Sequence, residues 1–125
     1  MKKIIILVVV VTVGIIVAAT WSLSKPPETV ETGPSKLDGF ARCIAKKKII
    51  MYGAEWCPHC QKQKALFGSA FRYISYVECP DNPKVCLDKG VKSYPTWIFP
   101  NGRRFEGEQS LEKLSKESSC PLPKK

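Results

Sequence analysis

An uninterrupted apolar run is the first feature of the hydrophobicity pattern. No charged residue lies between Ile4 and Ser24, and two lysines precede the run. A helix of about 20 such residues, at about 1.5 Å per residue, crosses a hydrocarbon core of about 30 Å. The run therefore predicts one transmembrane helix within a membrane anchor at residues 1–23. A cleaved signal peptide is the alternative, because residues 17–19 resemble a small-residue cleavage site.

Both alternatives place the remainder of the chain on the extracytoplasmic side of the membrane, in the periplasm or at the cell exterior. Lys2 and Lys3 hold the N-terminus on the cytoplasmic side. Residues 24–35 are polar, contain prolines and have no periodicity, which predicts a linker. The folded domain is therefore expected at residues 36–125.

Helical spacing and short apolar runs alternate along this domain. Leu37, Phe40 and Ile44 recur at helical spacing after Ser35, a plausible N-cap. The apolar run 49–52 is typical of a buried strand. The full predicted order is a helix at about 37–45, a strand at 49–52, a helix at 58–70, a strand at 73–77, a short helix within 79–89, strands at 96–99 and 103–106, and a helix opened by Ser110.

This order predicts an α/β fold. Strands that alternate with helices imply crossover connections and a parallel core. Pro100-Asn101-Gly102 is a strong hairpin signal, which adds one antiparallel edge. We expect a three-layer α/β/α sandwich.

Composition narrows the possible functions. From residue 36 onward there are 17 Lys and Arg against 9 Asp and Glu. The basic residues are dispersed and the aromatic residues have the pattern of a core, so we expect no nucleic-acid binding. Six cysteines in a small exported domain fit an oxidising compartment.

The sharpest chemical signal is the run Cys57-Pro58-His59-Cys60. Cys57 follows a predicted strand and opens a predicted helix, where unpaired backbone N–H groups and the helix dipole favour a thiolate. Cys60 lies one turn later, close enough to form a disulfide with Cys57. Pro58 fixes the first turn, and the imidazole of His59 is expected beside the thiolate, where it would make the disulfide a stronger oxidant.

Two other uses of this pair remain open. Cys57 and Cys60 together with Cys79 and Cys86 have a spacing that partly fits a zinc site, although the second pair is wide for it. The pair is also compatible with a purely structural disulfide. In the preferred interpretation the domain needs neither a metal nor a cofactor.

The residues Ala54-Glu55-Trp56-Cys57-Pro58-His59-Cys60 and Tyr94-Pro95-Thr96 resemble the active-site loop and the cis-proline loop of the thioredoxin superfamily. The resemblance implies a thioredoxin-like fold, with Cys57 as nucleophile and Cys60 as resolving cysteine. It also implies a catalytic role for Pro95 and a substrate-binding role for Trp56, Tyr94 and Thr96. The buried aspartate that classical thioredoxins carry six residues before the first cysteine is replaced by Met51.

Residues 37–119 more closely resemble the thioredoxin-like domain attached to bacterial vitamin K epoxide reductase homologues. That resemblance implies a membrane-tethered thiol–disulfide oxidoreductase that oxidises cysteines of exported proteins. Its partner would be a separate quinone-linked membrane oxidoreductase of the vitamin K epoxide reductase type. A reductase or isomerase of the same compartment, and a non-catalytic module held by zinc or disulfides, are the alternatives.

The remaining cysteines suit two structural disulfides. Cys79 and Cys86 flank a short polar loop, and Cys43 on the first helix lies within reach of Cys120. With Cys57 and Cys60 paired, four cysteines allow three connectivities. We favour Cys79–Cys86 and Cys43–Cys120, with a second, shuttling dithiol at Cys79 and Cys86 as the alternative.

Overall fold

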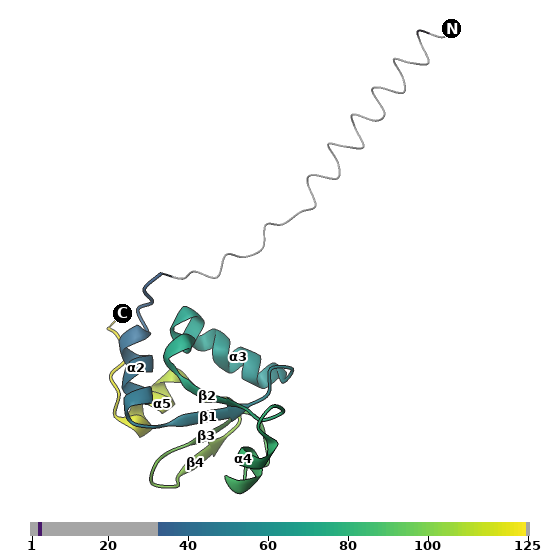
Figure 1. Ribbon diagram of the computed structural model, residues 1–125. Coiled ribbons are helices and arrows are strands. Elements are labelled where there is room, and N and C mark those ends of the chain that lie inside the picture. Colours follow the sequence, from purple (N-terminus) through teal and green to yellow (C-terminus); the bar gives the residue numbers. More distant parts are fainter. Residues whose placement is uncertain (1–2, 4–32, 125) are drawn as a thin grey trace. The chain divides into compact units, whose positions relative to one another are not determined.

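Short apolar segments pair into a four-stranded mixed sheet in the order β2-β1-β3-β4 (Figure 1). The computed structural model describes Lys3 and residues 33–124. Strand β1 (Ile50–Gly53) pairs in parallel with β2 (Ser75–Glu78) and antiparallel with β3 (Thr96–Ile98). Strand β3 pairs antiparallel with β4 (Arg104–Glu106), which confirms the predicted hairpin.

The predicted parallel core is wrong in one pairing, because β3 runs antiparallel to β1. The segment between β2 and β3 contains the short helix α4 (Pro83–Asp88) and is folded back by the Cys79–Cys86 disulfide. It therefore stays near the carboxyl ends of β1 and β2, where the N–H of Cys79 donates to the carbonyl of Gly53 at 2.8 Å. Strand β3 enters the sheet from that end and runs in the opposite direction.

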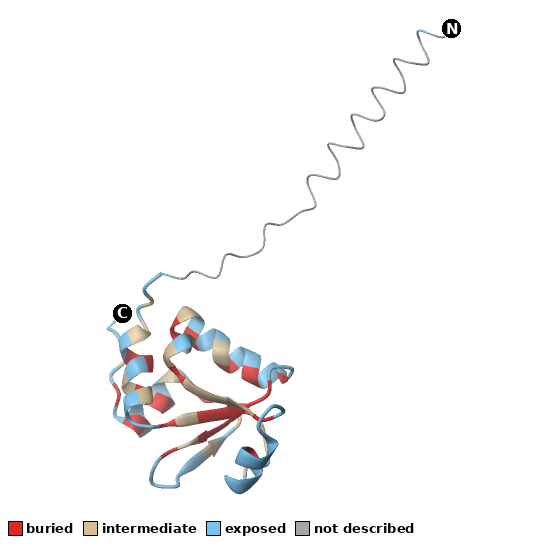
Figure 2. Cartoon of the chain, in the orientation of Figure 1, coloured by how far each residue is buried: buried red, intermediate tan, exposed pale blue. Residues whose placement is uncertain are grey.

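Helices cover the two faces of the sheet unequally. Met51 and Trp97 pack into one core cluster with residues of α2 (Asp38–Lys46), α3 (Pro58–Phe67) and α5 (Leu111–Ser118). On the other face, Tyr52 packs with the Cys79–Cys86 disulfide, which includes a residue of α4. Figure 2 shows buried residues on the central strands β1 and β3 and on one side of the helices, with the β3–β4 turn exposed.

Helix ends differ from the prediction at two places. Leu37, not Ser35, is the N-cap of α2, and the Ser35 hydroxyl accepts the N–H of Leu37 at 3.2 Å in the preceding turn. Helix α3 ends at Phe67, because Gly68 takes a positive φ of 54° and opens the 3-10 helix η1 (Gly68–Tyr73). Ser110 is the N-cap of α5, as predicted, and its hydroxyl accepts the N–H of Lys113 at 3.1 Å.

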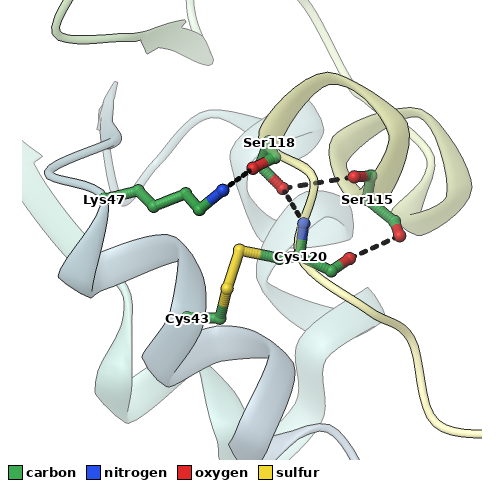
Figure 3. Close-up of a disulfide and its surroundings, with 5 residues drawn as sticks. All are labelled: Cys43, Lys47, Ser115, Ser118 and Cys120. Carbon is green, nitrogen blue, oxygen red and sulfur yellow. Dashed lines mark hydrogen bonds between the residues drawn. A yellow bond between two sulfur atoms is a disulfide. The ribbon is translucent and has the colours of Figure 1, made fainter.

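A disulfide joins the first and last helical segments of the domain. Cys43 of α2 is bonded to Cys120, two residues after α5 ends (Figure 3). The Lys47 ammonium donates to the carbonyl of Ser118, and the N–H of Cys120 donates to the Ser118 hydroxyl at 3.2 Å. The Ser115 hydroxyl donates to the carbonyl of Cys120. These bonds hold the turn after α5 against α2.

None of the helices within the described residues has the length and apolar character that crossing a bilayer requires. The predicted anchor at residues 1–23, apart from Lys3, and the predicted linker up to residue 32 lie outside the described residues.

Candidate active site

Cys57 and Cys60 lie at the start of α3 as free thiols. Cys57 is the N-cap residue, with extended backbone angles, and Pro58 occupies the first turn. The free amides of that turn place partial positive charge near the Cys57 sulfur. Cys57 retains 7% of its surface exposed, whereas Cys60 retains none. Cys57 is therefore the sulfur that a substrate can reach.

The segment before β3 brings a backbone carbonyl to Cys57. The Tyr94–Pro95 peptide bond is cis, and the Cys57 thiol donates to the Tyr94 carbonyl at a sulfur–oxygen distance of 3.8 Å. The hydroxyl of Thr96 donates to the carbonyl of Ser93 at 2.7 Å, which closes the turn. The two segments predicted to form the site, 37 residues apart in sequence, meet at the Cys57 sulfur.

An exposed aromatic side chain adjoins the dithiol. Trp56 is 68% exposed, and its ring meets the Tyr94 ring edge-on with 6.2 Å between centroids. Large exposed aromatic side chains are enriched where proteins bind other polypeptides. The Trp56 and Tyr94 rings thus provide an apolar surface next to Cys57.

A glycine makes room for the buried Cys60. A Cβ atom at Gly53 would lie 2.7 Å from the Cys60 sulfur and 3.3 Å from the Tyr76 hydroxyl oxygen, so no larger residue fits without displacement. Burial raises the pKa of the Cys60 thiol to about 11; a backbone hydrogen bond from Ala54 opposes the increase, the nearby Cys57 adds to it, and Lys64 weakly opposes it. Cys60 is therefore a thiol at neutral pH, which suits a resolving cysteine.

His59 makes a different contact from the one expected from the sequence. Its Nδ1 atom lies 2.6 Å from Oε1 of Glu108, in the segment between β4 and α5. The imidazole is 63% exposed. When protonated, it is one half of an ion pair, so the charge that acts on Cys57 is that of the His59–Glu108 pair and not of an isolated imidazolium.

A buried glutamine fixes α3 relative to the sheet. Gln63 is fully buried, and its amide nitrogen donates to the carbonyl of Gln109 at 3.0 Å. Its amide oxygen accepts the N–H of Gln109 at 2.6 Å and the indole N–H of Trp97 at 3.3 Å. Buried polar groups whose hydrogen bonds join several elements in this way favour one arrangement of those elements. The Cys57 end of α3 is thereby held at the carboxyl end of β1.

A family model described as thioredoxin matches residues 32–119. The chain belongs to the thioredoxin family.

Curated relatives of this thioredoxin domain are larger proteins. Thiol-disulfide oxidoreductase LTO1 of Arabidopsis thaliana is 41% identical over 81 residues, covering 58% of this chain and 21% of that protein. Thioredoxin domain-containing protein 5 homolog of Drosophila melanogaster is 34% identical over 93 residues, covering 62% and 22%. Protein disulfide-isomerase A5 of Bos taurus is 30% identical over 80 residues, covering 54% and 15%. The chain thus spans about a fifth or less of the length of these relatives.

Cysteine pairing in the thioredoxin domain bears on the zinc alternative. Cys79 is bonded to Cys86 and Cys43 to Cys120, the pairings favoured from the sequence. Cys79 and Cys86 therefore offer no thiolates to a shared zinc site. Among Lys3 and residues 33–124, no group of three or more His, Cys, Asp or Glu side chains is arranged to hold a metal ion.

Sequence reasoning missed several residues around the dithiol of this thioredoxin domain. Gly53 had a signal, because it ends a buried strand and precedes the two cysteines. The others had none, since their roles depend on contacts between segments 23 to 49 residues apart. These residues are Gln63, Tyr76, Glu78 and Glu108.

Proposed function

We propose that this thioredoxin domain is a thiol–disulfide oxidoreductase with Cys57 as the exchanging sulfur. The observation that carries the proposal is the Cys57 thiol at the N-terminus of α3, 3.8 Å from the Tyr94 carbonyl, with Cys60 free and buried one turn later. A substrate sulfur and Cys57 form a mixed disulfide, and Cys60 then attacks Cys57 and releases the substrate. The same steps in reverse transfer the disulfide to a substrate.

The surroundings of Cys57 suit a polypeptide substrate. Trp56 and the Tyr94 ring supply apolar contact area beside the sulfur. The backbone next to Pro95 offers an edge against which an extended peptide can pair. We assign substrate positioning to Trp56 and Tyr94, and the support of the Cys57 sulfur to Pro95. Thr96, expected from the sequence to bind substrate, is fully buried and its hydroxyl donates to the carbonyl of Ser93, so its role is to shape the turn.

We further propose that the enzyme acts outside the cytoplasmic membrane and oxidises cysteines of exported proteins. The apolar run at the N-terminus supports a tether at residues 1–23, and two disulfides elsewhere in the domain fit an oxidising compartment. A quinone-linked membrane protein of the vitamin K epoxide reductase type is the proposed re-oxidant, on the strength of the sequence resemblance.

Trapping of mixed disulfides tests the proposed roles. Cys60→Ser should accumulate mixed disulfides with exported proteins through Cys57, because the resolving sulfur is gone. Cys57→Ser should accumulate few, since Cys60 is fully buried. Non-reducing electrophoresis of cell extracts, with the Cys57→Ser/Cys60→Ser variant as control, measures the difference. Equal trapping by both single variants would contradict the assignment.

The direction of transfer needs a separate measurement, because several relatives are named protein disulfide-isomerases. Equilibration of the Cys57–Cys60 couple with glutathione gives its reduction potential. A value toward that of strong oxidants, about −120 mV, supports an oxidase, and one near thioredoxin's, about −270 mV, supports a reductase. An intermediate reduction potential of about −180 mV is typical of an isomerase.

A further inference from the structure

Cys60 has to lose a proton when it resolves a mixed disulfide, and its surroundings hold that proton in place. Burial raises the pKa of this thiol to about 11, and the neighbouring Cys57 sulfur acts in the same direction. Lys64, one turn further along α3, lowers the pKa but, as an ammonium, cannot accept a proton. A proton acceptor on another element that lies close to Cys60 would therefore speed this step.

Strand β2 supplies such a group. The Tyr76 hydroxyl oxygen and the Cys60 sulfur both lie close to Gly53, 3.3 Å and 2.7 Å from the point where its Cβ would stand. The space between the sulfur and the hydroxyl is thus no wider than one water molecule. The pKa of Tyr76 is raised by burial, by Glu78 and, more weakly, by Cys60 and Glu55, in accordance with this proximity.

The Glu78 carboxylate is held next to the Tyr76 hydroxyl by two hydrogen bonds. The Tyr76 hydroxyl donates to Oε2 of Glu78 at 2.5 Å, and the N–H of Glu55 donates to Oε1 at 2.8 Å. The Lys64 ammonium lies 4.0 Å from the centroid of the Tyr76 ring and holds the ring from the α3 side. Each carboxylate oxygen therefore has one donor, and these two hydrogen bonds hold the half-buried carboxylate beside the Tyr76 hydroxyl.

We propose that Tyr76 and Glu78 form the proton route of Cys60, with the Tyr76 hydroxyl next to the thiol and the Glu78 carboxylate as the acceptor. The proposal rests on the proposed dithiol exchange and assigns two residues on β2 that the Cys57–Cys60 motif does not contain.

The atoms and electrons of the resolving step balance along this route. The Cys60 S–H bond breaks and a bond forms from the Cys60 sulfur to the Cys57 sulfur. The bond from Cys57 to the substrate sulfur breaks, and its electron pair leaves with the substrate thiolate. The proton passes to the Tyr76 oxygen, directly or through one water, while the tyrosine proton moves to Glu78. In the reverse reaction the same groups return a proton to the Cys60 thiolate.

Reaction of the reduced full chain with the aromatic disulfide 5,5′-dithiobis(2-nitrobenzoate) separates the two cysteines in time. Cys57 attacks first and releases one coloured thiolate, and Cys60 then resolves the mixed disulfide and releases the second. Tyr76→Phe and Glu78→Gln should leave the first phase unchanged and slow the second by about 10²-fold at pH 7, the lower end of general acid–base effects. The deficit should shrink as pH approaches the pKa of Cys60, about 11, because the thiol then ionises without an acceptor.

Two variants serve as matched controls. Tyr73→Phe makes the same change in η1, and Glu112→Gln makes the same change at an exposed position of α5. Both should behave as wild type in both phases. If Tyr76→Phe fails to fold, Glu78→Gln carries the test alone, since its amide oxygen still accepts from Glu55. Second phases with the wild-type rate and pH profile in the two β2 variants would overturn the proton route and leave the proposed function standing. Absence of a second phase in wild type would instead contradict the proposed function.

Discussion

The Cys43–Cys120 disulfide should contribute far more to stability than Cys79–Cys86, although the two bonds have the same chemistry. The former closes a loop with a sequence separation of 77 residues and the latter one of 7. In the chain-entropy model, closing these loops in the unfolded state is worth about 4.5 and about 2.4 kcal/mol at 25 °C. The sulfurs pack into different core clusters but in both cases next to apolar groups, so the difference of about 2 kcal/mol should come mainly from loop length.

Urea unfolding of the full chain measures this difference. The variants are Cys43→Ala/Cys120→Ala and Cys79→Ala/Cys86→Ala. Both are made in a Cys57→Ser/Cys60→Ser background, which removes the thiols that would otherwise exchange with the remaining disulfide. A domain of this size has an m-value of about 1–3 kcal/mol/M, so a loss of about 4.5 kcal/mol lowers the midpoint by about 1.5–4.5 M. Many small domains have little more stability than that to lose.

The outcome that refutes this reasoning is an equal loss of unfolding free energy in the two variants, or a larger one without Cys79–Cys86. Either result would mean that loop closure in the unfolded chain does not govern the effect. The local bond would then act through the native state, by folding back the segment that leads from β2 to β3.

Two further predictions concern the dithiol. His59→Ser should make the Cys57–Cys60 couple more reducing by about 20–65 mV, from the loss of about 1–3 kcal/mol of thiolate support. Glu108→Gln should shift it in the opposite direction, because the carboxylate 2.6 Å from the imidazole offsets its charge. Equilibration with glutathione measures both, and identical shifts would refute the pairing. Separately, the free energy of unfolding of the reduced protein should fall relative to that of the oxidised protein as pH rises from about 9 to about 11. The raised pKa of the Cys60 thiol stabilises the fold below that window, and the stabilisation is lost as the thiol ionises. Tyr52 and Tyr76 have raised pKa values in that direction too, so the comparison must be between redox states at each pH. A constant difference would contradict the burial of Cys60.

Local signals in the sequence located most of the locally determined features, although the N-cap of α2 lies two residues after the predicted Ser35. Cys57 and Pro58 open α3, Ser110 caps α5, and the hairpin lies at Asn101, because each depends on residues within one turn. The predicted direction of β3 was wrong, because it depends on contacts far apart in the sequence. A connection that leads to a parallel strand and one that leads to an antiparallel strand can have the same helix and strand periodicity.

The residues of the candidate site also fall into those that the sequence indicates and those that only the structure reveals. Only two residues separate Cys57 from Cys60 in the sequence, so the dithiol could be recognised there. The Glu108 partner of His59 is 49 residues away and the Gln109 partner of Gln63 is 46 away. Such contacts are fixed by how α3 lies against the ends of β3 and β4. An isolated polar residue in a sequence does not indicate which partner it will meet.

The bond between Cys43 and Cys120 turns most of the domain into a covalent ring, with every strand and the dithiol inside it. A single cut by a protease at the exposed Asn101–Gly102 turn would open the ring without dividing the molecule. A cut before Cys43 would instead release the whole domain from whatever precedes it. A domain nicked at this turn keeps all of its parts on one molecule, and only reduction of the Cys43–Cys120 disulfide separates them.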